Sequence, residues 1–125
     1  GDVDTAAVML QTASGKICQI SNSRRATYGY DQRVEVHGSK GMLRADNMLE
    51  SSVEVATEDG FRRAPAQHFF LERYSEAYRL EMVHFIEATK AGVQPSPNIE
   101  DGLKAQMLAD AAATALATGQ PQRIA

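Results

Sequence analysis

The sequence predicts an α+β domain with a largely antiparallel open sheet and two helices that cover one face of that sheet. Short runs of alternating apolar residues, separated by tight turns, fill residues 5–57, and such spacing leaves no room for the long crossovers of parallel strands. From residue 70 onward the apolar residues recur every three or four positions, which is the period of a helix. Strands followed by helices are typical of the α+β layer.

The strands are predicted from period-two alternation between turn residues. The first carries apolar residues on both alternating faces, and a strand of this kind is expected to be covered on both sides. Because the helices cover one face, we expect the other face to mediate self-association into a homo-oligomer. The predicted strands are residues 5–12, 16–25, 33–37, 42–45 and 52–57, the last stopping at the turn 58–60.

The helices are predicted from apolar stripes and from their end signals. The stripe of the first helix runs from Phe70 to Ile86, and Gly92 and the following prolines end this helix. The second helix is expected over 99–118 and is expected to close at Gly119. Asn98 is its expected N-cap, and Asp101 lies in its first turn, where a carboxylate meets the positive end of the helix dipole.

Composition limits the possible partners. A chain of 125 residues with 43% hydrophobic and 23% charged residues has the make-up of one soluble domain. A net charge of -3 without a basic cluster argues against nucleic acid. No apolar run is long enough for a membrane helix, and a single cysteine excludes an internal disulfide framework, so we expect no membrane partner and a cytoplasmic location.

The sequence contains none of the common catalytic, metal or dinucleotide motifs. No Gly-x-Gly-x-x-Gly is present, and the turn 38–41 is a hairpin turn and not a phosphate loop. The histidines lie far apart and lack ligand partners at metal-binding spacing, and Cys18 is expected to be a small buried hydrophobe. We therefore predict no catalytic residue, no metal site and no cofactor site in this chain.

The charged and aromatic residues of the first helix have structural interpretations. Its glutamates are expected to form a solvated face that pairs with Arg79. Tyr74 and Tyr78 fit the core-facing stripe better than a ligand cage.

Residues 21–33 are chemically unusual because they combine hydroxyls, an amide, guanidinium groups, two tyrosines and an aspartate. Such a mixture can recognise a polyhydroxylated ligand, whose hydroxyls each need a donor and an acceptor. The alternative is a polar connection whose Arg–Asp pairs hold the loop, and composition alone favours this alternative.

The same residues carry a family resemblance. The motif Ser-Arg-Arg-Ala-Thr-Tyr-Gly-Tyr-Asp-Gln-Arg at 23–33, the Gly-Ser-Lys-Gly turn at 38–41 and the Asp-Gly helix start at 101–102 resemble the C-terminal domain of the inositol 2-dehydrogenase branch of the glucose-fructose oxidoreductase/inositol dehydrogenase (Gfo/Idh/MocA) family. The resemblance covers nearly the whole chain. The 23–33 motif is characteristic of the inositol branch, whereas the other two are similar across the family.

The resemblance implies a two-domain parent enzyme, an oxidoreductase that acts on a CH–OH group. An N-terminal Rossmann domain, missing from this chain, would hold NAD and the catalytic Glu-Lys-Pro and Asp-x-x-x-His motifs. Residues 1–125 would form a single substrate-binding and oligomerisation domain that does not catalyse alone.

The resemblance also implies which residues bind the polyol. Tyr28 looks like the tyrosine that reaches the substrate. Asn22, Arg25, Tyr30 and Asp31 are further candidates, with shaping the loop or serving an adjoining subunit as alternative roles.

Three other functions stay open. The fold could serve a different inositol isomer or another sugar, it could be an assembly module in which the polar segment is only structural, or it could be an independent ligand-binding domain.

Overall fold

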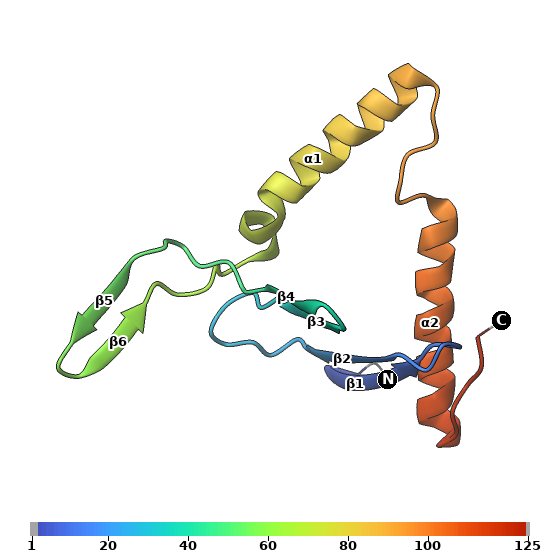
Figure 1. Ribbon diagram of the computed structural model, residues 1–125, viewed down its shortest axis with the longest axis horizontal. Coiled ribbons are helices and arrows are strands. Elements are labelled where there is room, and N and C mark those ends of the chain that lie inside the picture. The colour runs from blue at the N-terminus through green and yellow to red at the C-terminus, as the bar shows by residue number, and fades with distance from the viewer. Residues whose placement is uncertain (1–2, 125) are drawn as a thin grey trace. The chain divides into compact units, whose positions relative to one another are not determined.

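The computed structural model describes residues 3–124, which form strands in the first half and helices in the second. Figure 1 labels these elements in chain order. They are β1 (Thr5–Gln11), β2 (Ile17–Ser23), β3 (Val34–Gly38), β4 (Gly41–Ala45), β5 (Glu54–Thr57), β6 (Gly60–Arg63), α1 (Phe70–Ala91) and α2 (Ile99–Thr118). The predicted α+β class with antiparallel strands and two helices is confirmed.

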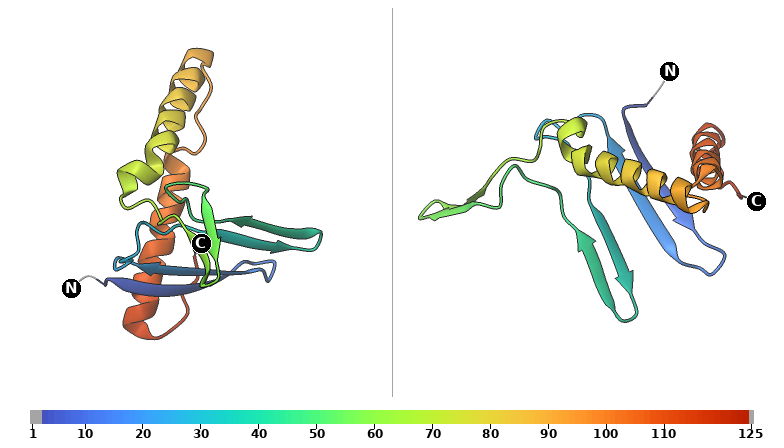
Figure 2. Two further views of the ribbon diagram at one scale, coloured as in Figure 1. Left: turned by 90° about the vertical axis from the view of Figure 1, so that its left-hand side faces the viewer. Right: turned by 90° about the horizontal axis from the view of Figure 1, so that it is seen from above.

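β1 pairs with β2, β3 with β4 and β5 with β6, so the strands described form three two-stranded sheets and not one continuous sheet. The hairpins β1–β2, β3–β4 and β5–β6 can each be followed in the views of Figure 2. Tight turns bring consecutive strands together at little loop-closure cost. The longer connections contribute one isolated bridge, Leu49 to Ala66, flanked by the hydrogen bonds Glu50 N to Pro65 O and Gln67 N to Met48 O.

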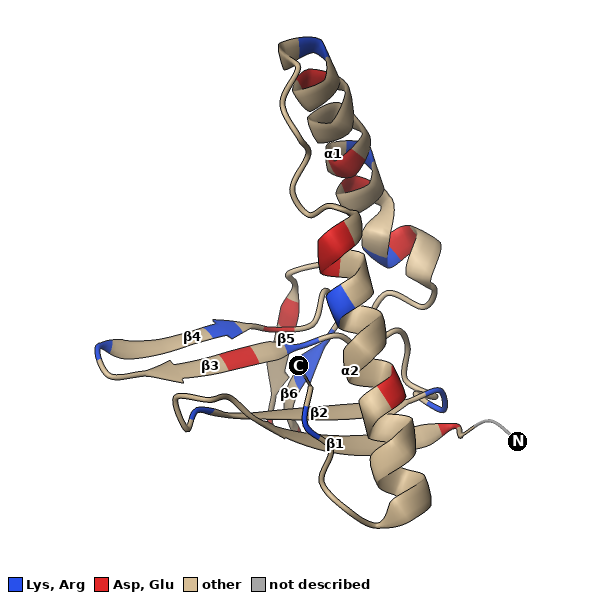
Figure 3. Cartoon of the chain, turned by 90° about the vertical axis from the view of Figure 1, so that its right-hand side faces the viewer, with Lys and Arg blue, Asp and Glu red and all other residues tan. Residues whose placement is uncertain are grey.

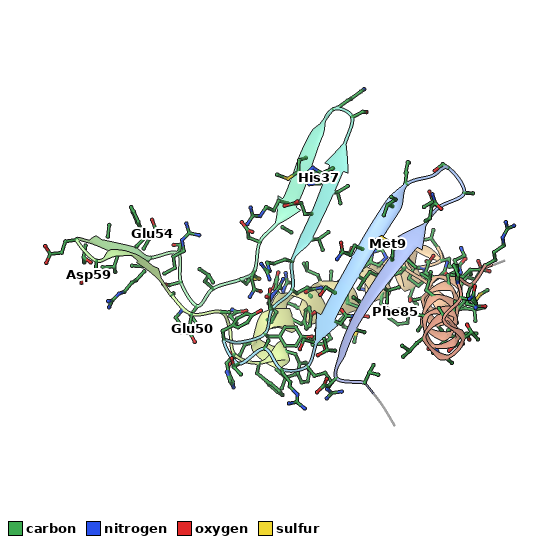
Figure 4. All side chains as sticks on the ribbon, turned by 90° about the horizontal axis from the view of Figure 1, so that it is seen from below. Met9, His37, Glu50, Glu54, Asp59 and Phe85 are labelled. Carbon is green, nitrogen blue, oxygen red and sulfur yellow. The ribbon has the colours of Figure 1, made fainter. Side chains whose placement is uncertain are left out.

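The β3–β4 hairpin has one apolar and one polar face. Val36 lies opposite Leu43 and Val34 opposite Ala45, whereas Glu35 lies opposite Arg44 on the other face. The predicted alternation of this segment is therefore confirmed. The face of Glu35 also carries His37, labelled on the hairpin in Figure 4, which lies opposite Met42 and whose Nε2 lies 2.7 Å from a Glu35 carboxylate oxygen.

All five predicted strands exist, and the structure adds a strand that the sequence analysis does not predict, β6. The sequence predicts that the turn at residues 58–60 ends a strand, but this turn is the reversal of a hairpin in which Thr57 lies opposite Gly60. Asp-Gly is a common hairpin dipeptide, so the signal for a further strand was present.

Both helices follow their predicted end signals. The Asn98 side chain accepts from the backbone N–H groups of Glu100 and Asp101, and Asp101 accepts from the Asn98 N–H, which completes a capping box. α2 ends at Gly119 in the left-handed conformation. Charged residues of both signs lie along α1 (Figure 3), and among them Glu76 forms the expected ion pair with Arg79.

Burial differs from the sequence prediction. Ala88 is the buried apolar side chain among the residues described, and the stripe residues Phe85 and Ile86 of α1 are exposed. On β1 one face is half-buried and the other, with Met9, is exposed. Cys18 is exposed and not buried, because both faces of β2 are open. The periodicity identifies the faces that favour burial, but it does not specify what covers them.

The chain divides into two compact units. One holds the described residues up to Ala7 together with Ser21–Arg79, and the other holds Val8–Ile20 together with the chain from Leu80 onward. The polar segment 21–33 lies wholly in the first unit. Neither of the two helices described is long and apolar enough to cross a membrane.

Candidate functional site

The candidate site is the connection between β2 and β3, whose start is tied to the residue before β1. The Arg24 N–H donates to the Asp4 carbonyl at 2.8 Å, and the Arg25 guanidinium lies 2.6 Å from the Asp4 carboxylate. The hydroxyls of Thr5 and Ser23 are 3.3 Å apart. These contacts fix where the connection leaves the hairpin.

Gly29 anchors the middle of the connection. It is buried, and its φ of +123° is a conformation that residues with a side chain rarely adopt. A Cβ at this position would lie 3.0 Å from the Ala66 Cβ and 3.0 Å from the carbonyl oxygens of Ala66 and Gln67. The next residue, Tyr30, donates its N–H to the Gln67 carbonyl at 2.8 Å. A glycine is required here so that the backbone can approach the 66–67 segment closely.

Tyr28, Asp31 and Arg33 form one hydrogen-bonded group. The Tyr28 hydroxyl donates to Asp31 Oδ2 at 2.5 Å. Arg33 donates from Nε to Asp31 Oδ1 and from Nη2 to Asp31 Oδ2, both at 2.8 Å. The Asp31 side chain is only 14% exposed, whereas Tyr28 is 61% exposed. The carboxylate is thus shielded, while the tyrosine remains available to a ligand.

The hydrogen bonds of this group set its ionisation. The bond from Tyr28, followed by the bonds and charge of Arg33, lowers the pKa of Asp31 below its ordinary value against an opposing effect of burial. The bond to Asp31 raises the pKa of Tyr28 above its ordinary value. Near neutral pH the group therefore contains a carboxylate anion, a guanidinium cation and a neutral phenol.

Tyr30, Tyr74 and Tyr78 form a separate aromatic group. The Tyr30 ring meets the Tyr74 ring edge-on at 5.4 Å between centroids, and Tyr74 meets Tyr78 at 6.1 Å. The Arg73 guanidinium lies 5.5 Å from the Tyr74 ring centroid, within the range of a cation–π contact. A hydrogen bond with Tyr30 raises the pKa of Tyr74. Tyr74 is half-buried, as expected for the stripe, but Tyr78 is exposed.

The structure brings together some of the sequence candidates and not others. Tyr28 and Asp31 are in direct contact, whereas the Tyr30 ring contacts the Tyr74 ring. Arg25 pairs with Asp4 and Asn22 is an exposed residue of β2, so neither joins the Tyr28 group. The structure adds Arg33 to the group, and its spacing two residues after Asp31 is a sequence signal for this pair.

An Arg–Asp pair of the kind that the alternative interpretation requires is present between Arg33 and Asp31. The same pair also positions the Tyr28 hydroxyl, so holding the loop and binding a ligand are compatible roles.

The residues present do not fit a dinucleotide. A pyrophosphate is usually held by the free N–H groups at a helix N-terminus. In α2 these groups are taken by Asn98, beside the carboxylate of Asp101. Ahead of α1, the Glu72 carboxylate accepts from the N–H groups of His68 and Phe69. Both ends thus carry a negative charge that would repel phosphate. Within residues 3–124 no three His, Cys, Asp or Glu side chains are grouped to hold a metal ion.

A family model described as "Oxidoreductase family, C-terminal alpha/beta domain" matches residues 1–124. The chain is 56% identical over 117 residues to the inositol 2-dehydrogenase of Rhizobium meliloti, covering 94% of this chain and 36% of the relative. It is 49% identical over 116 residues to the myo-inositol 2-dehydrogenase of Thermotoga maritima, covering 93% and 35%.

A solved structure supports the same relationship. The crystal structure of a myo-inositol dehydrogenase from Corynebacterium glutamicum superposes with a TM-score of 0.87 at 42% identity, covering 94% of this chain and 35% of that one. The chain therefore spans about a third of the length of the relatives it matches.

Proposed function

The chain belongs to the Gfo/Idh/MocA oxidoreductase family as its C-terminal α/β domain, and from this we propose that it supplies the polyol-binding half of an inositol 2-dehydrogenase. The observation that carries the proposal is the exposed Tyr28 hydroxyl, held by a shielded Asp31, in a chain whose relatives at 56% and 49% identity are named for inositol oxidation. Tyr28 binds a hydroxyl of the polyol, and Gly29 and Arg33 keep it in place.

The redox chemistry belongs to another part of the protein. We propose that residues 1–125 are one domain of a longer chain whose N-terminal Rossmann domain binds NAD, which is supported by relatives about three times as long. This domain orients the polyol and takes no part in hydride transfer. Asn22 and Arg25 remain candidates for the polyol site once that domain is in place.

We further propose that the parent is a cytoplasmic homo-oligomer. The single cysteine of the sequence supports a reducing compartment. The apolar face of β3–β4, formed by Val34, Val36 and Leu43, supports the proposal of a homo-oligomer. Each of these side chains is more than half exposed, and exposed apolar faces of this kind usually mark an interface.

The test is Tyr28→Phe in the full-length protein. Loss of one hydrogen bond should lower kcat/KM for myo-inositol roughly tenfold, mainly through KM if the contact is the same in ground and transition states. Tyr78→Phe is the matched control, because Tyr78 is also exposed but donates no hydrogen bond to Asp31. Unchanged kinetics of Tyr28→Phe would remove Tyr28 from the site.

The same assay tests two of the other candidate functions. Turnover of a scyllo-inositol or a sugar in preference to myo-inositol would identify a different substrate within the family. Absence of any polyol turnover by the full-length protein would favour an assembly module.

A further inference from the structure

We propose that Asp31 is a positioning residue that makes Tyr28 a hydrogen-bond acceptor toward the ligand, so that the site selects a polyol with a free hydroxyl donor at the position facing Tyr28. The inference rests on the proposed function, because it requires Tyr28 to contact the polyol. It adds a rule for which ligands are accepted.

The argument begins with the single proton of a phenol. A tyrosine hydroxyl has one hydrogen to donate and lone pairs that accept. In this chain the Tyr28 hydrogen is directed to Asp31 Oδ2, 2.5 Å away. What remains for a ligand is the lone-pair side of the oxygen, and hydrogen bonding to an anion makes that oxygen a stronger acceptor.

The Asp31 carboxylate is less exposed than the other carboxylates in the ion pairs described. Its side chain is 14% exposed, whereas those of Asp4, Glu35, Asp46, Glu54 and Glu76 are between 37% and 66% exposed in their own ion pairs. Arg33 binds both of its oxygens. Water therefore competes weakly for Asp31, and a ligand is not expected to displace it from Tyr28.

The consequence for selection follows from complementarity. A free hydroxyl can donate to the Tyr28 oxygen, but a group that only accepts places two lone pairs against each other. Replacing the matching hydroxyl by fluorine should therefore be worse than replacing it by hydrogen, because fluorine is repelled and hydrogen is merely neutral.

The test uses single-position deoxy and deoxy-fluoro inositols, excluding the position that is oxidised, with the full-length protein. For each position the ratio of kcat/KM for the fluoro analogue to that for the deoxy analogue is measured. We expect one position at which the ratio is below one by roughly threefold to tenfold, and at that position Tyr28→Phe should bring the ratio close to one.

Asp31→Ala frees the Tyr28 proton, so the ratio at that position should rise above its wild-type value as the phenol begins to donate to fluorine. Arg33→Gln is the matched structural control: it removes the ion pair that holds the loop but leaves Asp31 to accept from Tyr28, and its ratio should stay below one. If Asp31→Ala does not fold, Asp31→Asn should shift the ratio in the same direction by less, because an amide oxygen is a weaker acceptor than a carboxylate.

The two proposals fail in different ways. If Tyr28→Phe changes neither the kinetics nor the ratio at any position, the proposed function of Tyr28 is wrong. If Tyr28→Phe weakens polyol use but the folded Asp31 variants keep the wild-type ratio, or Arg33→Gln shifts it as much as they do, Tyr28 binds the polyol and the role of Asp31 is overturned.

Discussion

Gly29→Ala should destabilise the protein and displace Tyr28. The backbone at Gly29 has a φ of +123°, and an alanine Cβ would lie 3.0 Å from the Ala66 Cβ and from the carbonyl oxygens of Ala66 and Gln67. Both oxygens belong to the backbone and cannot rotate away. The connection must therefore shift at the point where Tyr30 is hydrogen-bonded to Gln67.

The expected magnitude has two parts. Holding a residue with a side chain in this region of φ costs about 1–3 kcal/mol, and a close contact that must be relieved by backbone movement costs a further 1–3 kcal/mol or so. The free energy of unfolding should fall by about 2–6 kcal/mol in total. Gly60→Ala is the matched control, because Gly60 has a φ of +112° but nothing within 4 Å of an added Cβ.

Urea unfolding of the full-length variants, followed by circular dichroism, measures these free energies, and kcat/KM for myo-inositol reports the position of Tyr28. We expect Gly29→Ala to cost more than Gly60→Ala by the contribution of the close contact, and only Gly29→Ala to raise KM. Equal destabilisation by the two substitutions would show that the approach of Gly29 to residues 66–67 is not a constraint.

Three further predictions concern a helix end and the pH dependence of stability. Asn98→Ala removes the acceptor for the Glu100 and Asp101 N–H groups and should lower the free energy of unfolding in urea by about 1 kcal/mol; an unchanged midpoint would contradict a role for the capping box. Because the pKa of Asp31 is lowered in the folded state, its stabilisation is present above the ordinary aspartate pKa and lost as pH falls through the lowered value. The difference in urea midpoint between wild type and Asp31→Asn should therefore shrink on acidification below about pH 4, and a constant difference would count against the pairing. The pKa of Tyr28 is raised, so the corresponding advantage over Tyr28→Phe should be lost as pH rises above about 10.

The local elements could be predicted because their signals are local. Asn98 caps α2, Gly119 ends it and the turn 38–41 joins β3 to β4, and each of these depends on residues a few positions apart. The signal for β6 is local too, because Asp59-Gly60 is a hairpin turn that joins β5 to β6 and does not only end β5.

Burial could not be predicted in the same way. The apolar period of α1 identifies the face that carries Phe85, yet that residue is exposed, because period alone does not specify what covers a face. The prediction that Cys18 is buried is wrong for the same reason, because both faces of its strand are open. The relatives are about three times as long as this chain.

The candidate site was partly predictable. The composition of residues 21–33 leaves a ligand site and a structural connection open, and the family resemblance indicates Tyr28 and Asp31 within this segment. That they contact each other, that Arg33 completes the group and that Tyr30 instead meets Tyr74 depend on the turn at Gly29. The requirement for that turn comes from Ala66 and Gln67, more than thirty residues later in the chain.

The closure of the connection around Gly29 has an entropic consequence. Immobilising a side chain at a binding surface costs about 0.5–1.5 kcal/mol when it occurs on association. Here two features restrict the rotation of the Tyr28 ring and the direction of its O–H bond during folding. One is the hydrogen bond to Asp31, and the other is the close approach of the Gly29 backbone to residues 66–67. A polyol arriving at this surface would meet a preorganised partner, so more of the energy of its hydrogen bond would appear as affinity.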